Sequence, residues 1–467
     1  MPIAKRSRYV WLQGGLAVAL LILIFAPWVL FRSGSTLRTP YNLVIVSMDT
    51  LRADHLSCQG YGQPTSPNID ALASRGTRFA TALSTSAWTS PAHASLFTSR
   101  YPSQVGIVGY QELKSAHRLQ DEERTLAEIL KEAGYDTRAI TGGGFVSGEL
   151  GFAQGFDEYS SAPVHQQDLQ FQLQPTLDWI AKRTDQERPF FLFLHFYDCH
   201  RAYTPPAEWA KRFVPDPNGP LEQQRLCGPG VLPSPSQIAL QVGLYDAEIA
   251  YADYQLGQVF QALAASGHER DTLVVFVSDH GEEFKDHGGC DHIHSLYHEL
   301  VRVPLIFAGP RVPLGRVVEA PVSLLDVAPT ILELLYLPSE PRMEGESLIP
   351  AMHGANPARR YQFFESGFAP EDSVRRGVRS ESAKLIFDHA DRPIELYDLA
   401  ADPNEQRNLL AGGEFPPEHD HLRKAYADWR AHLRQRSDSA VSSRNGDHAL
   451  DPETKERLRA LGYGDAP

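Results

Sequence analysis

Cysteine is scarce in this chain, because its 467 residues contain only Cys58, Cys199, Cys227 and Cys290. They form no C-x-x-C pair, so neither a zinc motif nor a dithiol redox motif is indicated. Four cysteines also do not make a disulfide scaffold, and the sequence alone does not specify whether or how they pair.

Long basic runs are missing too, and the formal net charge is −14, so we expect no nucleic-acid partner. There is no internal repeat. The glycines at 142–144 and 148 lack the G-x-x-x-x-G-K-[ST] pattern of a phosphate-binding loop, which favours a flexible loop. The composition is 42% hydrophobic and 22% charged, which is typical of a globular protein with a sizeable core.

The N-terminus differs from the rest of the chain. Residues 1–8 are basic, and residues 9–31 are almost wholly apolar. A helix of roughly 20 apolar residues spans a bilayer core, and the basic residues before it place the remainder outside the cytoplasm. We therefore expect a cytoplasmic segment (1–8), a transmembrane anchor (9–31), a linker (32–41) and a periplasmic or otherwise extracytoplasmic catalytic domain. A cleaved signal peptide is the alternative, and either segment exports the protein.

Apolar strands alternate with helical segments from residue 42 to residue 335, which predicts an α/β fold: a mostly parallel sheet sandwiched by helices. We assign residues 42–350 to this domain. In residues 351–436 the pattern changes to short strands and one helix, which indicates a small antiparallel sheet covered by a helix. Residues 437–467 form a polar tail, mobile over its first part, with a short helix expected at 454–461. The strands expected in the two regions are 42–47, 77–83, 136–140, 190–196, 272–277, 303–307, 374–379, 383–388 and 394–398.

Polar residues follow three of the buried strands at the edge where open α/β sheets bind ligands. They are Asp49, then Asp198 with His200, and then Asp279 with His280. A fourth candidate lies in the Ser/Thr-rich stretch 84–100, where Thr89 stands at the expected start of a helix. Free N–H groups at a helix N-terminus favour an anion, so a hydroxyl there is a candidate nucleophile.

Two carboxylates, an imidazole and a hydroxyl can together hold one hard or borderline divalent cation. We therefore expect two of these carboxylates, one of the imidazoles and the Thr89 hydroxyl to bind Ca²⁺, Mn²⁺ or Mg²⁺, with Zn²⁺ as a further candidate. Such a cation lowers the pKa of a bound hydroxyl. His200 and His292 are candidates to bind the anion or to protonate a leaving group. The chemistry indicated is displacement at sulfur or phosphorus through a covalent intermediate.

Four ordered runs resemble the sulfatase family of the alkaline phosphatase superfamily: NLVIVSMDTLRADHLSCQGY, WTSPAHASLFTSRYP, FVSDHGEEFKDHG with HSLYHELVRVPLIF, and KLIF followed by IELYDLAADPNEQRNLL. The resemblance implies a sulfatase-type domain, a C-terminal four-stranded subdomain and a cation on Asp49, Asp279 and His280. It places the nucleophile at Thr89, with His200 and His292 near the transferred group. The remaining candidate site residues are His93 for catalysis and, for substrate binding, Arg52, His195, Lys285 and His294.

The chain departs from this family at three positions. Thr89 stands where sulfatases carry the Cys or Ser that becomes formylglycine, His93 where they carry Arg, and Thr50 where many have a second Asp. Oxidation of threonine would give a ketone, so no formylglycine is expected. A covalent intermediate on Thr89 would instead be hydrolysed at the transferred centre. A two-metal site is the structural alternative.

The sequence thus predicts a metal-dependent, sulfatase-like hydrolase of sulfate esters acting outside the cytoplasm. Its substrate would be an anionic ester, derived from a glycan or a lipid. Three alternatives stay open. They are a hydrolase of phosphate monoesters, diesters or phosphonate esters, a transferase of phospho-headgroups to an envelope glycan or lipid, and a catalytically inactive binding protein.

Overall fold

The computed structural model describes residues 41–107, 110–111, 115–183, 188–221, 226–227, 231–356, 360–367, 374–436, 448–461 and 463. Residues 41–467 form one compact unit. The expected basic segment and anchor, the linker before residue 41, and the first part of the tail fall outside the described residues. Among the helices that are described, none has the length and apolar character needed to cross a bilayer.

The described part of the chain contains a central sheet of eight strands. Strands β1, β8, β9, β6, β7, β2 and β14 pair in parallel where they meet, whereas β13 runs antiparallel to both of its neighbours. The mostly parallel sheet expected from the sequence is therefore confirmed. In spatial order the strands are β14 (Arg316–Val318), β2 (Gly76–Phe79), β13 (Leu305–Ala308), β9 (Thr272–Val277), β1 (Asn42–Met48), β8 (Phe190–Phe196), β6 (Asp136–Thr141) and β7 (Glu158–Ser161).

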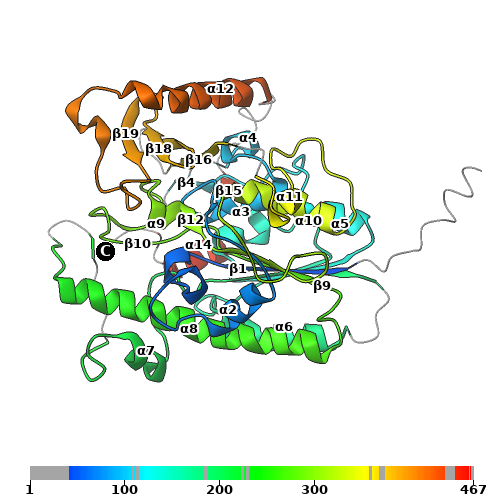
Figure 1. The fold of residues 1–467 in the computed structure, drawn as a ribbon. Helices are drawn as coiled ribbons and strands as arrows, with labels where there is room; N and C mark the ends of the chain where they lie inside the picture. The colour runs from blue at the N-terminus through cyan, green and yellow to red at the C-terminus, as the bar shows by residue number, and fades with distance from the viewer. Residues whose placement is uncertain are drawn as a thin grey trace, which may run out of the picture. The chain divides into compact units, whose positions relative to one another are not determined.

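Helices cover both faces of this sheet (Figure 1). One face carries α2 (Pro67–Ser74), α6 (Leu169–Ala181) and α8 (Pro235–Ala265), with α7 (Ala207–Phe213) packed on α8. The other face carries α3 (Thr89–Thr98), α5 (Leu126–Glu132), α10 (Val327–Leu334) and α11 (Ile349–Met352).

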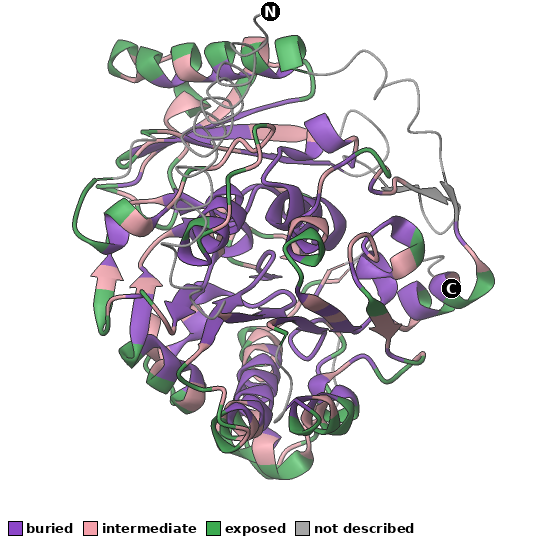
Figure 2. Cartoon of the chain, turned by 90° about the vertical axis from the view of Figure 1, so that its right-hand side faces the viewer, coloured by how far each residue is buried: buried purple, intermediate pink, exposed green. Residues whose placement is uncertain are grey.

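Side chains of a strand alternate between the two faces, so each central strand contributes to two cores. In β1, Leu43 and Ile45 pack into one apolar cluster, and Val44 and Val46 pack into the other. The central strands are buried and the exposed residues lie on the outer helices and loops, as Figure 2 shows. Burial on both faces explains why β1, β8 and β9 are continuous apolar runs in the sequence.

A second, antiparallel sheet is built from β16 (Gln362–Ser366), β17 (Arg375–Arg379), β18 (Ala383–Phe387) and β19 (Pro393–Asp398). Helix α12 (Asp420–Arg436) lies over it and packs through Leu422, Tyr426, Trp429 and Leu433 (Figure 1). The predicted antiparallel sheet and its helix are confirmed, and β16 is the fourth strand that the family resemblance implies.

Local differences from the expected elements have identifiable causes. The expected strand at 303–307 is divided at Pro304 into β12 (Arg302–Val303) and β13, since proline has no N–H for the ladder. The expected strand at 77–83 is divided into β2 and β3 (Ala82–Leu83), and β3 pairs with β12 and β15 (Val322–Ser323) in a separate small sheet. Helix α6 contains Pro175 and was not expected from the sequence. A short helix in the tail was expected and is present as α14 (Pro452–Ala460).

Candidate active site

The order of the central strands brings the polar strand ends together. Strands β9, β1 and β8 are direct neighbours and parallel, so the residues after them share one edge of the sheet. Asp49 follows β1, Asp279 and His280 follow β9 after one residue, and His200 follows β8. Helix α3 begins at this edge with Thr89 as its first residue.

Asp49, Asp279 and His280 form a compact set of candidate ligands. One side-chain atom from each lies within 4.8 Å of the other two. Thr89 Oγ1 donates to Asp49 Oδ2 at 3.2 Å and lies 3.3 Å from His280 Nε2. We call Asp49, Thr89, Asp279 and His280 the ligand cluster. It is fully buried, and it joins two carboxylates, an imidazole and a hydroxyl.

The donor chemistry of the ligand cluster fits a divalent cation. Asp49 Oδ1 and Asp279 Oδ2 are buried and accept no hydrogen bond from the described residues. Burial raises the pKa of Asp49 well above its ordinary value, and the nearby negative charge of Asp279 raises it further. Two buried carboxylates with unused oxygen atoms are costly unless a positive charge lies between them. A cation bound there would offset the repulsion between Asp49 and Asp279 and would give both unused carboxylate oxygens a partner.

His93 and His195 line the cluster from inside the fold. His93 Nδ1 bonds the carbonyl of Thr89 at 2.9 Å and lies 3.5 Å from Asp279 Oδ2, while its Nε2 bonds Ser47 Oγ at 2.9 Å. His195 Nε2 lies 3.3 Å from Asp49 Oδ2. Burial lowers the pKa of both histidines, so both imidazoles are neutral at neutral pH. In this state they orient the cluster and add no positive charge to it.

His200 and His292 form the other side of the site, with ring centroids 5.1 Å apart. Each uses Nδ1 to fix its ring: His200 bonds the carbonyl of Arg201 at 2.7 Å, and His292 bonds Glu282 Oε1 at 3.0 Å. Burial lowers the pKa of both histidines well below the ordinary value. An anion bound beside them would favour their protonated forms.

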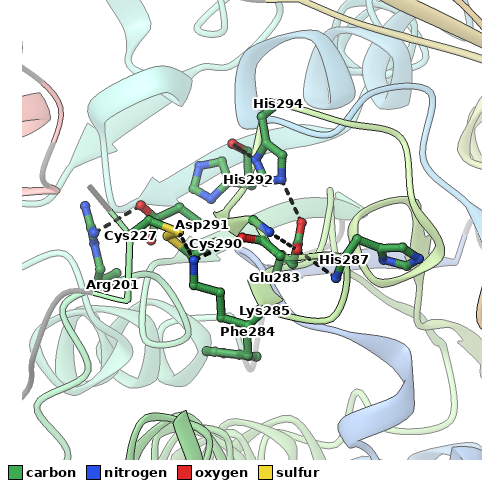
Figure 3. Close-up of a disulfide and its surroundings, with 12 residues drawn as sticks. Arg201, Cys227, Glu283, Phe284, Lys285, His287, Cys290, Asp291, His292 and His294 are labelled. Carbon is green, nitrogen blue, oxygen red and sulfur yellow. Dashed lines mark hydrogen bonds and ion pairs between the residues drawn. A yellow bond between two sulfur atoms is a disulfide. The ribbon is translucent and has the colours of Figure 1, made fainter. Parts of the chain in front are cut away.

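Two of the predicted substrate-binding residues, Lys285 and His294, contact residues outside the ligand cluster (Figure 3). Lys285 Nζ lies 3.0 Å from Cys227 Sγ and donates to the carbonyl of Gly288 at 3.0 Å. Cys227 forms a disulfide with Cys290. His294 Nε2 bonds Glu283 Oε2 at 2.7 Å, and its side chain is 38% exposed.

Arg52 is buried, and its guanidinium is held by two carboxylates. It forms ion pairs with Asp54 at 2.8 Å and with Asp286 at 3.0 Å, and it donates to the carbonyl of Glu282. An anionic substrate would have to compete with both carboxylates for this charge. The structure thus gives Arg52 a clear part in holding the segment after β9 against the segment after β1.

Two residues without a role predicted from the sequence also lie in the site. Glu282 is buried and bonds both His292 and Tyr203 Oη, the latter at 3.1 Å. Its position in the polar run that follows β9, close to Asp279 and His280, could have identified it as a candidate site residue. Tyr463 comes from the C-terminal segment, and its hydroxyl contacts both His200 and His292. A single tyrosine in a polar tail carries no sequence signal of this kind.

Two models of known protein families match this chain. The sulfatase family model matches residues 41–337, which is more than half of the chain. The model of the N-sulphoglucosamine sulphohydrolase C-terminal region matches residues 286–432. The two matches together cover the central sheet, the ligand cluster and the antiparallel C-terminal sheet.

Curated relatives match over most of their length. A sulfatase of Formosa agariphila is 26% identical over 452 residues, covering 84% of this chain and 88% of the relative. An arylsulfatase of Clostridium perfringens is 26% identical over 455 residues, covering 82% and 93%.

Solved structures share the fold. A structure in complex with D-glucosamine-2-N,6-O-disulfate superposes with a TM-score of 0.68 at 20% identity, covering 85% of this chain and 98% of the other. The phosphonate monoester hydrolase of Agrobacterium radiobacter also gives 0.68, at 22% identity, covering 88% and 100%. The chain belongs to the sulfatase family and is an enzyme of the sulfuric ester hydrolase type.

Proposed function

We propose that this chain is a metal-dependent hydrolase of sulfate esters that uses Thr89 as its nucleophile. The observation that carries the proposal is the position of Thr89 Oγ1, at the first residue of α3 and within 3.3 Å of both Asp49 and His280. A hydroxyl there lies beside acceptors for its proton and beside the positive end of a helix dipole.

The residues that would hold the cation are Asp49, Asp279 and His280, with Thr89 as a fourth ligand. Ca²⁺, Mn²⁺ and Mg²⁺ suit the two carboxylates, and the imidazole also admits Zn²⁺. When bound, such a cation lowers the pKa of a ligated hydroxyl and neutralises charge on an ester oxygen.

The proposed reaction has two displacements at sulfur. In the first, Thr89 Oγ1 attacks the sulfuryl group, its proton leaves to a neighbouring acceptor, and the bond to the leaving alcohol breaks. His200 and His292 flank the transferred group and supply the proton that the leaving oxygen takes. In the second, water attacks the sulfur of the sulfated Thr89 and releases sulfate. Threonine cannot form the formylglycine aldehyde, so elimination without attack at sulfur is not open to this intermediate.

Phosphorus esters are the second candidate substrates, and Thr89 itself is the observation that favours them. An alcohol nucleophile whose intermediate is hydrolysed at the transferred centre suits phosphate and phosphonate esters as well as sulfate esters. The fold also occurs in a protein named as a phosphonate monoester hydrolase. Transfer to a glycan or lipid acceptor in place of water would use the same covalent intermediate.

We further propose that the substrate is a glycan-derived anionic ester and that the catalytic domain works outside the cytoplasm. A fold neighbour was solved with a disulfated glucosamine, which supports a sugar as the leaving group. The Cys227–Cys290 disulfide supports an oxidising compartment. The apolar residues 9–31 support export through a membrane anchor.

Assays of the full chain on matched aryl sulfate, phosphate, phosphodiester and phosphonate substrates, each with Ca²⁺, Mn²⁺, Mg²⁺ or Zn²⁺, test the proposal. The expected result is highest kcat/KM on the sulfate ester, lost in Thr89→Ala. Higher kcat/KM on a phosphorus ester would select the second candidate. Absence of turnover on every ester, with or without a glycan acceptor, would contradict a hydrolase or transferase function.

A further inference from the structure

Helix α14 (Pro452–Ala460), Leu461 and Tyr463, which we call the C-terminal segment, pack against the central domain. Leu458 in α14 is fully buried, and Leu461 is 6% exposed; the apolar core beside the central sheet includes Leu458. Thr454 Oγ1 donates to Glu149 at 3.2 Å, and Arg457 Nε donates to the carbonyl of Ala162 at 3.1 Å. These contacts join a segment near the end of the chain to the loop and strand that follow β6.

The glycines after β6 make room for this segment. A Cβ on Gly143 would lie 3.0 Å from Arg457 Cδ, and a Cβ on Gly144 would lie 3.0 Å from both Leu461 Cδ1 and Tyr197 Oη. Both glycines also have positive φ, at 74° and 60°. The glycine run that the sequence suggests is a flexible loop is therefore a packed contact with the C-terminal segment.

As a result of this packing, Tyr463 lies in the active site. The Tyr463 ring packs edge-on against Phe145 with centroids 4.8 Å apart. The hydroxyl lies 3.0 Å from His200 Nε2 and hydrogen-bonds His292 Nε2. Since Nδ1 of each histidine is already bonded, Nε2 is the atom that each presents to a bound ester. Tyr463 Oη thus lies at the position where the two imidazoles converge.

The hydrogen-bond roles at this position follow from proton counts. His200 Nδ1 donates to a carbonyl, so in the neutral ring Nε2 accepts, and the donor must be the Tyr463 hydroxyl. A phenol has one proton, so the contact with His292 requires an N–H at His292 Nε2, which a neutral ring carries only if its Nδ1 accepts the hydrogen bond from a protonated Glu282. One phenol oxygen therefore accepts from one histidine and donates to the other. If the hydroxyl turns its single proton away from His200, it can donate that proton to an oxygen of a bound anion instead.

We propose that Tyr463 is a substrate-contacting residue of this enzyme, whose hydroxyl donates a hydrogen bond to an oxygen of the ester bound between His200 and His292. The inference deepens the proposed function and rests on it. The Tyr463 N–H donates to the carbonyl of Leu458 at 2.9 Å, so the residue is tied to α14 and its hydroxyl is held beside the two histidines.

The test compares Tyr463→Phe with wild type on the ester that the enzyme turns over. The phenylalanine ring keeps the contact with Phe145 and removes only the hydroxyl. Loss of a hydrogen bond to a charged group predicts a fall in kcat/KM of roughly 10- to 100-fold, with little change in thermal stability. Tyr254→Phe is the matched control, since Tyr254 is 53% exposed on α8, and it should leave kcat/KM unchanged.

Unchanged or increased kcat/KM in Tyr463→Phe would overturn the inference, and an increase would identify the tyrosine as an occluding group. Calorimetric titration with inorganic sulfate and with vanadate keeps this test separate from the proposed function. If wild type binds either anion but turns over no ester, the proposed reaction fails, whereas weaker anion binding by Tyr463→Phe still supports the contact. Equal anion binding by the two proteins would count against it.

Discussion

Thr89 Oγ1 and Asp49 Oδ2 lie 3.2 Å apart, although 40 residues separate them in the chain. Asp49 follows the central strand β1, and Thr89 is the first residue of α3, so two rigid elements fix the distance. The helix supplies free N–H groups at Thr89, and the strand supplies a buried carboxylate. This pairing of nucleophile and candidate metal ligand is the basis of the first two predictions.

Thr89→Ala should lower kcat by about 10³-fold or more, because it removes the attacking oxygen while helix α3 keeps its packing. Thr89→Ser is the matched variant, since it retains a hydroxyl at the same atom position and should keep measurable turnover. Intact-mass measurement after rapid quenching should show a sulfated or phosphorylated chain in wild type and none in Thr89→Ala. Equal rates in Thr89→Ala and wild type would exclude Thr89 as the nucleophile.

Removal of divalent cations should abolish turnover, and their return should restore it and raise the melting temperature. The reason is that a cation binding only the folded state stabilises it, by about 2.7 kcal/mol at a concentration 100 times Kd. Asp279→Asn removes one of the two carboxylates and should weaken or remove the cation-dependent shift. Asp428→Asn changes an exposed carboxylate on α12 and should keep it. A full shift in Asp279→Asn would contradict the assigned ligand cluster.

Much of the central domain could be predicted because its signals are local. Strands β8 and β9 have the bounds expected from their apolar runs, since burial on both faces favours apolar residues at nearly all of their positions. The grouping of Asp49, Asp279 and His200 followed from one rule, that parallel strands end at the same edge of a sheet.

Features that depend on contacts between distant parts of the chain could not be predicted from local sequence patterns. The two carboxylates that hold Arg52 include Asp286, which lies 234 residues away in the chain, and no local pattern pairs them. Lys285 has a positive φ of 71° and contacts a disulfide whose pairing the sequence left open. Tyr463 reaches His200 only because α14 packs where Gly143 and Gly144 leave space.

The buried pair of Lys384 and Glu405 provides a test of stability away from the active site. Their charged atoms lie 2.8 Å apart, and the two side chains are 1% and 0% exposed. Lys384→Met should lower the free energy of unfolding by about 3–5 kcal/mol, because it leaves the Glu405 carboxylate buried without its cation. Lys424→Met breaks a pair with Asp428 in which both side chains are largely exposed, and it should cost far less. Urea unfolding of the two variants measures the difference, and equal costs would contradict the prediction.

His287 should make stability depend on pH above neutrality. Burial alone would lower its pKa, but the hydrogen bond to Glu299 at 2.7 Å and the charge of that residue outweigh burial and raise the pKa to about 9. The ring also stacks on Tyr297 and bonds the carbonyl of Glu405, so it joins the catalytic domain to the C-terminal region. The favourable interaction of its charge with Glu299 exists only in the folded state.

The sign follows from the two pKa values. Below the ordinary pKa of 6.5 both the folded and the unfolded chain carry the proton, and the stabilisation is complete. Between 6.5 and about 9 the unfolded chain loses the proton first, so the free energy of unfolding falls as pH rises, by about 1–3 kcal/mol over this range. Urea unfolding at several pH values should show this fall in wild type and a flatter profile in His287→Gln. His353→Gln alters an exposed histidine and should reproduce the wild-type profile, so a His287→Gln profile as steep as wild type would show that another group causes the dependence.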